Sequence, residues 1–249
     1  MKLTILGTAT PYPVPGNACS GYLLGSGATT VWMDAGTGTL AELQRHSALA
    51  DLSAIWISHR HADHAADLLV TYYALRFGTL RPASPIPLIG PEGLVDRLAG
   101  FLGPQSMEKL SEVFAFTEMH GWGDAQFGDI SLSWGPVSHG IPAFAVKASA
   151  GGSQFTYSGD TAPCISLIEL AEGSQTLLCE SGQGEIIGDE APVHHTPEDA
   201  GRSATQAGVN RLILTHITES ISPKVAARRA ATAFTGTIEI AAPGAVFTV

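Results

Sequence analysis

The chain has 249 residues, of which 45% are hydrophobic and 14% charged, and its formal net charge is −10. This composition is typical of a globular protein that buries roughly 70–75% of its unfolded surface, and it excludes a disordered chain. No apolar run reaches the roughly 18 residues of a membrane span, so no membrane segment is expected. The opening MKLTILGTATPYP predicts a first strand rather than a signal peptide, because threonine and glycine interrupt its short apolar run. We expect a cytoplasmic protein.

The charge balance also bears on partners, because 13 basic residues stand against 23 acidic ones and the basic residues are scattered. Proteins that bind long nucleic acids use several Lys or Arg side chains against the phosphates. A long nucleic acid is therefore disfavoured, and a small-molecule substrate is expected. The three cysteines are widely spaced and form no CxxC motif, which is typical of free thiols in a reducing compartment.

In chain order, the predicted elements begin with a strand-rich third, followed by a strand and a helix across residues 54–77. The proline-rich residues 80–93 predict a loop around a short strand, the middle of the chain is strand-rich again, and βα alternation follows Asp160. Thr196-Pro197-Glu198-Asp199 is typical of a helix start, with a cap residue, an N1 proline and an N3 acid. Strands are expected at 3–6, 20–24, 30–33, 54–57, 86–89, 113–116, 130–134, 144–148, 154–157, 176–179, 209–215 and 236–249, and helices at 65–77, 94–102, 165–171, 196–208 and from 222 onward. This pattern predicts an α/β sandwich of layers in one domain, residues 1–249.

Residues 56–67, WISHRHADHAAD, place three of the nine histidines and an aspartate within six positions. His59 and His61 lie two apart on an extended exit from a strand, so their side chains point the same way and can bind one ion. Asp63 and His64 begin the next helix and can serve a second ion. Burying three imidazoles and a carboxylate together without an ion is costly unless each finds a partner. The motif therefore predicts a metal site.

Further donors stand where apolar runs end. His139 follows LSWGPVS, Asp160 follows FTYSG and His216 follows RLILT. Loops at strand ends allow distant segments to converge on one point. Because imidazole and carboxylate donors accept zinc, manganese or iron, we expect two divalent metal ions, with zinc as the first choice.

The segment HRHADH is similar to the HxHxDH signature of the metallo-β-lactamase superfamily. The order HxHxDH, SHGIP, SGDT and LTHI resembles its ribonuclease Z-like branch, as do LTILGTAT, MDAG and IGPEG. The resemblance spans nearly the whole chain and implies a four-layer αβ/βα sandwich with a dimetal site along one edge, and a homodimer. It implies the following ligands: His59, His61 and His139 for one ion, Asp63, His64 and His216 for the other, and Asp160 as the bridge.

The resemblance also implies a reaction, the hydrolysis of a phosphodiester by a hydroxide that bridges the two ions. In this branch a histidine positioned by a glutamate gives a proton to the leaving alkoxide. Glu180, in TLLCES, and His195, in HHTPEDAG, match this pair, with His194 as the neighbouring alternative. Asp63 is expected to be a metal ligand that also orients the attacking hydroxide.

Ribonuclease Z proper carries a long tRNA-gripping arm between its third histidine ligand and the bridging aspartate. Here His139 and Asp160 are only 21 positions apart, and two predicted strands joined by a Gly-Gly turn fill that interval. Together with the net charge of −10, this departure favours a small phosphodiester such as a cyclic nucleotide over tRNA 3′ processing.

Two other functions remain open. The same ligand set permits acyl hydrolysis of a lactone, thioester or β-lactam, although that chemistry has no special need for the Glu180/His195 pair. A metal-holding accessory protein without hydrolytic activity is the third alternative, and the complete set of donors weighs against it.

Overall fold

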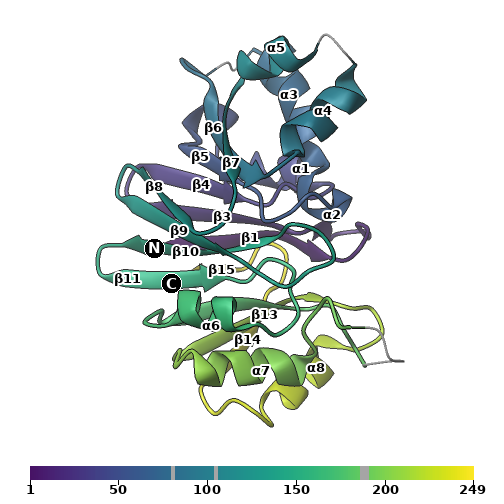
Figure 1. Ribbon diagram of the computed structural model, residues 1–249, viewed down its shortest axis with the longest axis vertical. Helices are drawn as coiled ribbons and strands as arrows, with labels where there is room; N and C mark the ends of the chain where they lie inside the picture. Colours follow the sequence, from purple (N-terminus) through teal and green to yellow (C-terminus); the bar gives the residue numbers. More distant parts are fainter. Residues whose placement is uncertain (80–81, 104–105, 186–190) are drawn as a thin grey trace.

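Two β-sheets pack face to face, and helices cover the outer side of each (Figure 1). The computed structural model describes residues 1–79, 82–103, 106–185 and 191–249. The strands are β1 (Lys2–Ala9), β2 (Ala18–Cys19), β3 (Gly21–Ser26), β4 (Thr29–Met33), β5 (Ala54–Trp56), β6 (Ile86–Pro91), β7 (Phe114–Met119), β8 (Gly123–Phe127), β9 (Ile130–Pro136), β10 (Phe144–Ala150), β11 (Ser153–Tyr157), β12 (Thr176–Ser181), β13 (Arg211–Ile217), β14 (Thr237–Ile240) and β15 (Val246–Thr248). The α-helices are α1 (Thr39–Leu43), α2 (Ala62–Ala65), α3 (Asp67–Phe77), α4 (Leu94–Leu102), α5 (Ser106–Ser111), α6 (Ile165–Ala171), α7 (Pro197–Gln206) and α8 (Pro223–Ala230), with one 3₁₀ turn, η1 (Leu49–Asp51).

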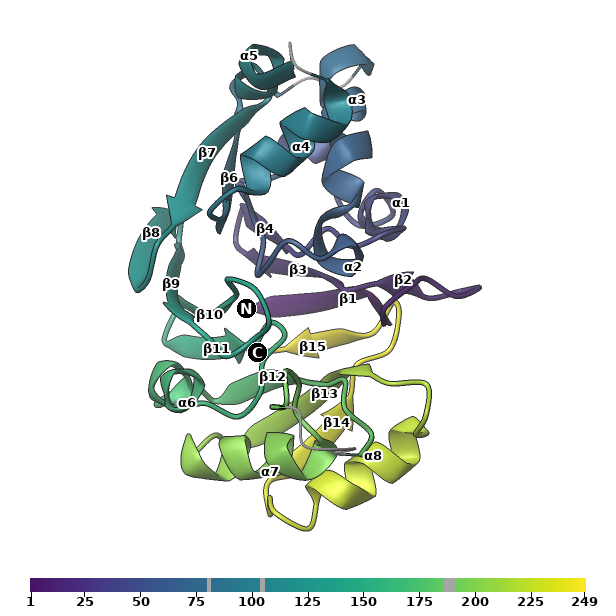
Figure 2. The same ribbon diagram turned by 45° about the vertical axis from the view of Figure 1, so that its right-hand side comes forward.

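The two sheets have matching topologies. The first has the order β15-β1-β3-β4-β5-β6-β7, with β2 beside β1, and the second has the order β14-β13-β12-β11-β10-β9-β8. In each sheet an antiparallel block adjoins a parallel one: β4 to β7 are parallel in the first, and β11 to β14 in the second. Parallel strands need crossover connections, and Figure 2 shows the helices of these crossovers above the first sheet and below the second. The predicted four-layer αβ/βα sandwich is confirmed.

Alternating apolar residues explain this layering, because successive side chains of a strand point to opposite faces. Side chains from both inner faces, such as Ile5, Trp56, Leu132 and Tyr157, form one shared buried cluster. The outer faces pack against the helices in two further clusters, one under α3 and α4 and one under α6, α7 and α8. Among the described residues, no helix combines the length and the apolar character that crossing a membrane requires.

The parallel strands place the site. Asp34 follows β4, His59 lies three positions after the end of β5, and Asp160 lies on the loop after β11. Glu180 lies near the end of β12 and His216 near the end of β13. The carboxyl ends of parallel strands are where open α/β sheets bind ligands. Two sheets thus present their loops to one shared edge.

Several element boundaries differ from the prediction. The expected helix at 65–77 is two helices, α2 and α3, and the expected strand at 236–249 is β14 in the second sheet and β15 in the first. Pro243 and Gly244, whose φ is 78°, turn the chain between them. The sequence also missed β8, whose residues GDAQF include no β-branched side chain, and the short helices α1 and α5. Residues 80 and 81 of the predicted 80–93 loop lie outside the described residues.

Candidate metal-binding active site

The first group of donors consists of three imidazole nitrogens. His59 and His61 lie on the loop after β5, and His61 is also the N-cap residue of α2. The Nε2 of His59 lies 3.0 Å from the Nδ1 of His61, and the Nε2 of His139, from the loop after β9, lies 3.2 Å from that same Nδ1. The three predicted ligands of one ion therefore meet, although 78 residues separate His61 from His139.

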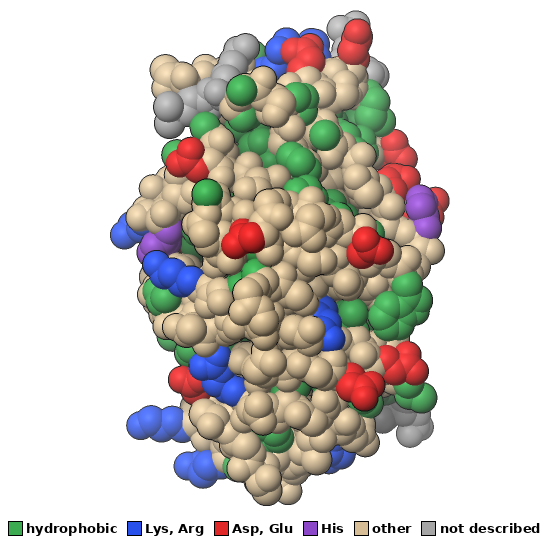
Figure 3. Space-filling model, turned by 90° about the vertical axis from the view of Figure 1, so that its left-hand side faces the viewer, with side chains coloured by type: hydrophobic (Ala, Val, Ile, Leu, Met, Phe, Trp, Pro, Cys, Tyr) green, Lys and Arg blue, Asp and Glu red, His purple; other side chains and the backbone are tan. Residues whose placement is uncertain are grey.

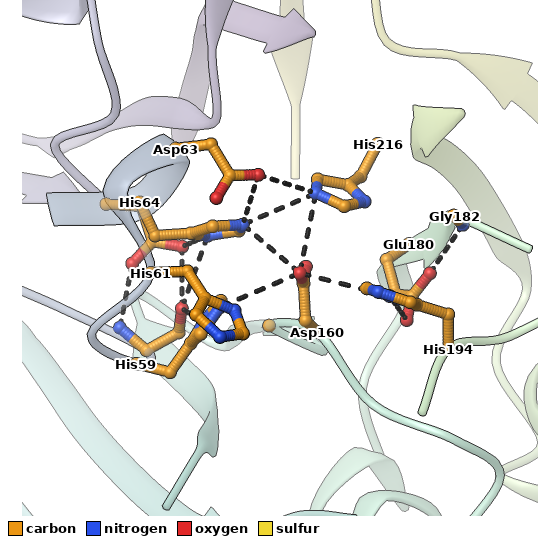
Figure 4. Close-up of polar contacts among 12 residues, drawn as sticks. His59, His61, Asp63, His64, Asp160, Glu180, Gly182, His194 and His216 are labelled. Atoms are coloured by element: carbon orange, nitrogen blue, oxygen red, sulfur yellow. Dashed lines mark hydrogen bonds and ion pairs between the residues drawn. The ribbon is translucent and has the colours of Figure 1, made fainter. Parts of the chain in front are cut away.

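The second group is buried and joins Asp63 and His64 of α2 to Asp160 and His216 (Figure 4). The Nε2 of His216 lies 3.4 Å from the Nε2 of His64 and 3.3 Å from the Oδ2 of Asp63. The Oδ2 of Asp160 lies 3.3 Å from His64 Nε2, 3.4 Å from His216 Nε2 and 3.7 Å from His59 Nε2. Asp160 thus touches both groups, as a bridging residue must.

These donors fit divalent cations. In each group the candidate ligand atoms lie within 4.8 Å of one another. Imidazole nitrogens therefore lie close to one another and to the carboxylates of Asp63 and Asp160. Asp160 Oδ1 and His216 Nδ1 are buried and have no hydrogen-bond partner among the described residues, which is costly for polar atoms. Such a set of imidazole and carboxylate donors is what zinc, manganese or iron binds.

Burial and neighbouring charges shift the pKa values of His59 and His64 in opposite directions. Burial, reinforced by the nearby His64 imidazole, holds the pKa of His59 well below its ordinary value. Burial also opposes protonation of His64, but the carboxylates of Asp160 and Asp34 outweigh it and raise the pKa of His64 well above its ordinary value. The carboxylates of Asp160 and Asp34 therefore favour positive charge at this position, which a bound cation would supply.

Asp34 orients one face of this cluster. Its fully buried carboxylate accepts hydrogen bonds from the backbone N–H of Ser58, the Ser58 hydroxyl, the Tyr157 hydroxyl and the Nδ1 of His64, at 2.7–2.8 Å. Because Nδ1 of His64 donates to Asp34, its Nε2 is left with a lone pair toward the cluster. Tyr157, whose hydroxyl is one of these donors, was not among the predicted site residues. Both Asp34 and His216 have left-handed backbone, with φ of 56° and 49°.

The structure replaces His195 with His194 as the partner of Glu180. The Nδ1 of His194 lies 2.9 Å from the Glu180 Oε1, and its side chain is 25% exposed. His195 is fully buried: its Nδ1 donates to the Thr161 carbonyl at 2.6 Å, and its Nε2 lies 2.9 Å from the Ser203 hydroxyl. Only the backbone N–H of His195 reaches Glu180.

The position of His195 beside the cap of α7 explains this correction. His195 directly precedes Thr196, the N-cap residue of α7, and its ring turns toward Ser203 on that helix. The chain bends at His194, and the ring of His194 lies beside Asp160 and stacks on His216 of the cluster.

Charge and burial act in opposite directions on His194. Burial lowers the pKa of His194, but the hydrogen bond to Glu180 and its negative charge more than compensate and raise it to about 9. Backbone N–H groups of Thr161 and Gly182 also donate to the Glu180 carboxylate, at 3.0 and 2.6 Å. Glu180 is therefore held in place by the chain, and it holds His194.

Hydroxyl groups beside the ligands support the loops. The Ser158 hydroxyl accepts from the Glu180 backbone N–H at 3.0 Å and donates to the Gly159 carbonyl. The Thr161 hydroxyl accepts from the Ser138 N–H at 3.1 Å and donates to the Ala162 carbonyl. Both hydroxyls are thus engaged with backbone groups, and they fix the loops that carry the ligands.

A β-lactamase superfamily domain model matches residues 29–217. An uncharacterized protein of Mycobacterium tuberculosis is 33% identical over 224 residues, which cover 87% of this chain and 81% of that protein. A ribonuclease Z of Mycobacterium bovis BCG is 30% identical over 274 residues, covering 96% of this chain and 95% of that enzyme. The crystal structure of the metallo-β-lactamase fold protein YhfI from Bacillus subtilis superposes with a TM-score of 0.86 at 24% identity and covers 99% of both chains.

The family model covers most of the chain, and the fold and the ribonuclease Z relative agree with it. The chain therefore belongs to the metallo-β-lactamase superfamily of hydrolases and is similar to its ribonuclease Z branch.

Proposed function

We propose that the chain is a dinuclear metal-dependent phosphodiesterase that acts on small phosphodiesters such as cyclic nucleotides. One ion would be held by His59, His61 and His139, the other by Asp63, His64 and His216, with Asp160 between them. Two divalent ions, with zinc favoured over manganese or iron, supply Lewis acidity and an activated water.

The pairing of His194 with Glu180 carries the choice of phosphodiester hydrolysis. The Nδ1–H of His194 donates to Glu180, so the ring is fixed in orientation, and its Nε2 makes no hydrogen bond with any described residue. His194 Nδ1 also lies 3.9 Å from Asp160 Oδ2, so the ring stands beside the donor cluster. A protonated imidazole in this position can give its Nε2 proton to a leaving alkoxide, which is the group that needs one.

The lack of an arm supports a small substrate. Between His139 and Asp160 the chain forms only β10 and β11, which pair antiparallel through the turn at Gly151 and Gly152. On the face drawn in Figure 3 both acidic and basic side chains are present, and among the described residues of that face the basic side chains form no continuous band. With a net charge of −10, a small phosphodiester fits this protein better than a long polyanion.

Acyl hydrolysis of a lactone or thioester uses the same cluster and is the second candidate. Nothing in that reaction requires a histidine fixed by a buried glutamate next to the leaving group, so the His194–Glu180 pair favours the phosphodiester.

We retain the homodimer and the cytoplasmic location as predictions.

A substrate panel with a leaving-group comparison tests the proposal. Purified protein supplied with zinc or manganese is assayed with bis(p-nitrophenyl) phosphate, a 3′,5′-cyclic nucleotide, a lactone and a thioester. We expect metal-dependent turnover of both phosphodiesters. His194→Asn should slow the cyclic nucleotide, whose leaving alkoxide is poor, by about 10²–10⁴-fold, and the p-nitrophenyl ester much less.

The exposed His120, which lies outside the donor cluster, provides the matched control. His120→Asn should leave both rates unchanged. Equal slowing of both substrates by His194→Asn would remove the acid role, and turnover of only the lactone or thioester would establish the acyl hydrolase instead.

A further inference from the structure

A pocket of about 420 Å³ shares His216 with the donor cluster. Its walls come from both sheets: the end of β1 and the following loop on one side, and the ends of β13 and β14 with the start of α8 on the other. A volume of this order lies within the range of small-molecule sites. The Nε2 of His216 faces Asp63 and Asp160, so the cluster and the pocket adjoin at this residue.

The lining of this pocket is polar but carries no positive charge. Hydroxyl and amide groups of Thr8, Thr10, Asn17, Thr218 and Ser222 line it, together with apolar side chains from Ile217, Ile221 and Ile240. Among the described lining residues the single charged side chain is the carboxylate of Glu219. Phosphate sites use Lys, Arg or helix N–H groups, and here the hydroxyl of Ser222 already caps α8 by accepting from the Val225 N–H. This pocket therefore suits a neutral group with hydroxyls rather than an anion.

The pocket wall is built by long-range contacts. The Asn17 side chain accepts from the Thr8 backbone N–H at 3.0 Å and donates to the Thr8 hydroxyl at 3.1 Å. The Tyr12 hydroxyl donates to Glu219 Oε2 at 3.0 Å, which ties the loop after β1 to the loop after β13. The hydroxyl of Thr10 has no hydrogen-bond partner among the described residues, so it is available to a ligand. The cavity is thus preformed and keeps an unused polar group.

We propose that this pocket receives the neutral, hydroxylated part of the substrate, the nucleoside of a nucleotide phosphodiester, while the phosphate lies over the donor cluster. The apolar side chains contact the faces of the base or sugar, and the hydroxyl and amide groups bind the sugar hydroxyls. The position of the phosphate in this assignment rests on the proposed function. The pocket identifies a further part of the substrate, the nucleoside, that the enzyme would recognise.

The test separates binding from turnover. Ile221→Trp fills the pocket, Thr10→Val removes its free hydroxyl with little change of shape, and Ile165→Trp on α6, at a side chain that is 72% exposed, is the matched control. Binding of adenosine, which has no phosphate, is measured by titration calorimetry on protein without added metal. The kcat/KM values for a cyclic nucleotide and for methyl p-nitrophenyl phosphate are measured on the metal-loaded protein.

We expect adenosine to bind the wild type, and Ile221→Trp to weaken that binding about tenfold or more. The kcat/KM for the cyclic nucleotide should fall by a similar factor, while methyl p-nitrophenyl phosphate, which lacks a nucleoside, should be hydrolysed as before. Thr10→Val should have the same selectivity with a smaller effect, and Ile165→Trp should change nothing.

Failure of the two proposals can be told apart. Adenosine binding that Ile221→Trp removes, with no phosphodiester hydrolysed, would retain the pocket and overturn the proposed function. Wild type that does not bind adenosine, or Ile221→Trp that slows both phosphodiesters equally, would overturn the pocket assignment while leaving the phosphodiesterase in place.

Discussion

The first sheet supplies four donor side chains from six consecutive residues, 59–64. The second sheet supplies His139 and Asp160 from loops after two different strands and His216 from the end of a third. The two regions also differ in what holds them. A single buried carboxylate, Asp34, fixes His64 and the neighbouring Ser58. The second region depends on contacts between loops, such as the 2.9 Å hydrogen bond from His139 Nδ1 to the Val193 carbonyl. A set of donors on one short segment keeps its geometry during loop movement better than a set of donors spread over several segments does.

Removing the buried carboxylate of the first region should have the largest effect. Asp34→Asn replaces an acceptor of four hydrogen bonds with an amide that presents hydrogens to some of those donors. We expect metal affinity to fall by about 10–100-fold, the usual cost of losing such a supporting carboxylate, together with lower stability. Competition with a chromophoric chelator measures the affinity.

The exposed Asp129 accepts from the Ser26 hydroxyl on the surface and provides the control. Asp129→Asn should leave metal affinity unchanged. If Asp34→Asn bound zinc as tightly as wild type, the compact region would not depend on this carboxylate.

The adjacent histidines of the second region should have different roles, with His195 needed for stability and His194 for activity. His195→Ala leaves the buried Ser203 hydroxyl and Thr161 carbonyl without their partners, which costs about 1–3 kcal/mol for a group left unsatisfied. Burial lowers the pKa of His195, so its ring is neutral, and its Nδ1–H donates to the Thr161 carbonyl. Chemical denaturation should show the loss of stability, while activity per folded molecule stays close to wild type. A preferential loss for substrates with poor leaving groups would return the acid role to His195.

An ion pair at the edge of the second region should have the smallest effect. Arg229 donates two hydrogen bonds to Glu198, at 2.7 and 2.8 Å, and a third to the Gly184 carbonyl, on the segment that follows Glu180. The hydrogen bond from Arg229 lowers the pKa of Glu198 below its ordinary value of 4.5. The pair therefore stabilises the fold at neutral pH. This contribution decreases as the pH falls below 4.5, and it is lost once the pH passes the lowered pKa of Glu198 in the folded chain.

Glu198→Gln should cost about 0.2–1 kcal/mol at neutral pH, since solvent screens the partly exposed pair. The difference from wild type should shrink in salt and vanish in acid, as urea denaturation at several pH values will show. Glu42→Gln, which breaks the exposed pair with Arg45 near the first region, is the matched control. A difference that persists in acid would mean that packing, not charge, is responsible.

Much of the compact region can be predicted from sequence, because its donors are neighbours and one loop conformation places them all. The dispersed donors required a resemblance, since no spacing in the chain tells which strand ends meet. His194 and His195 show the limit most clearly. Both stand beside the same helix cap, but in the folded chain the ring of His195 packs on Ser203 of α7 while the ring of His194 lies beside Asp160. Tyr157 gave no sequence signal, because an aromatic residue in a buried strand is ordinarily part of the core.

Asp34 and His216, one from each sheet, occupy backbone conformations that most side chains avoid. Left-handed geometry costs an ordinary L-residue roughly 1–2 kcal/mol, and glycine would adopt it freely. At these two positions, selection for stability and selection for activity favour different residues. Lineages that lose the activity should drift toward glycine or asparagine there, and so leave a record of the loss in their descendants.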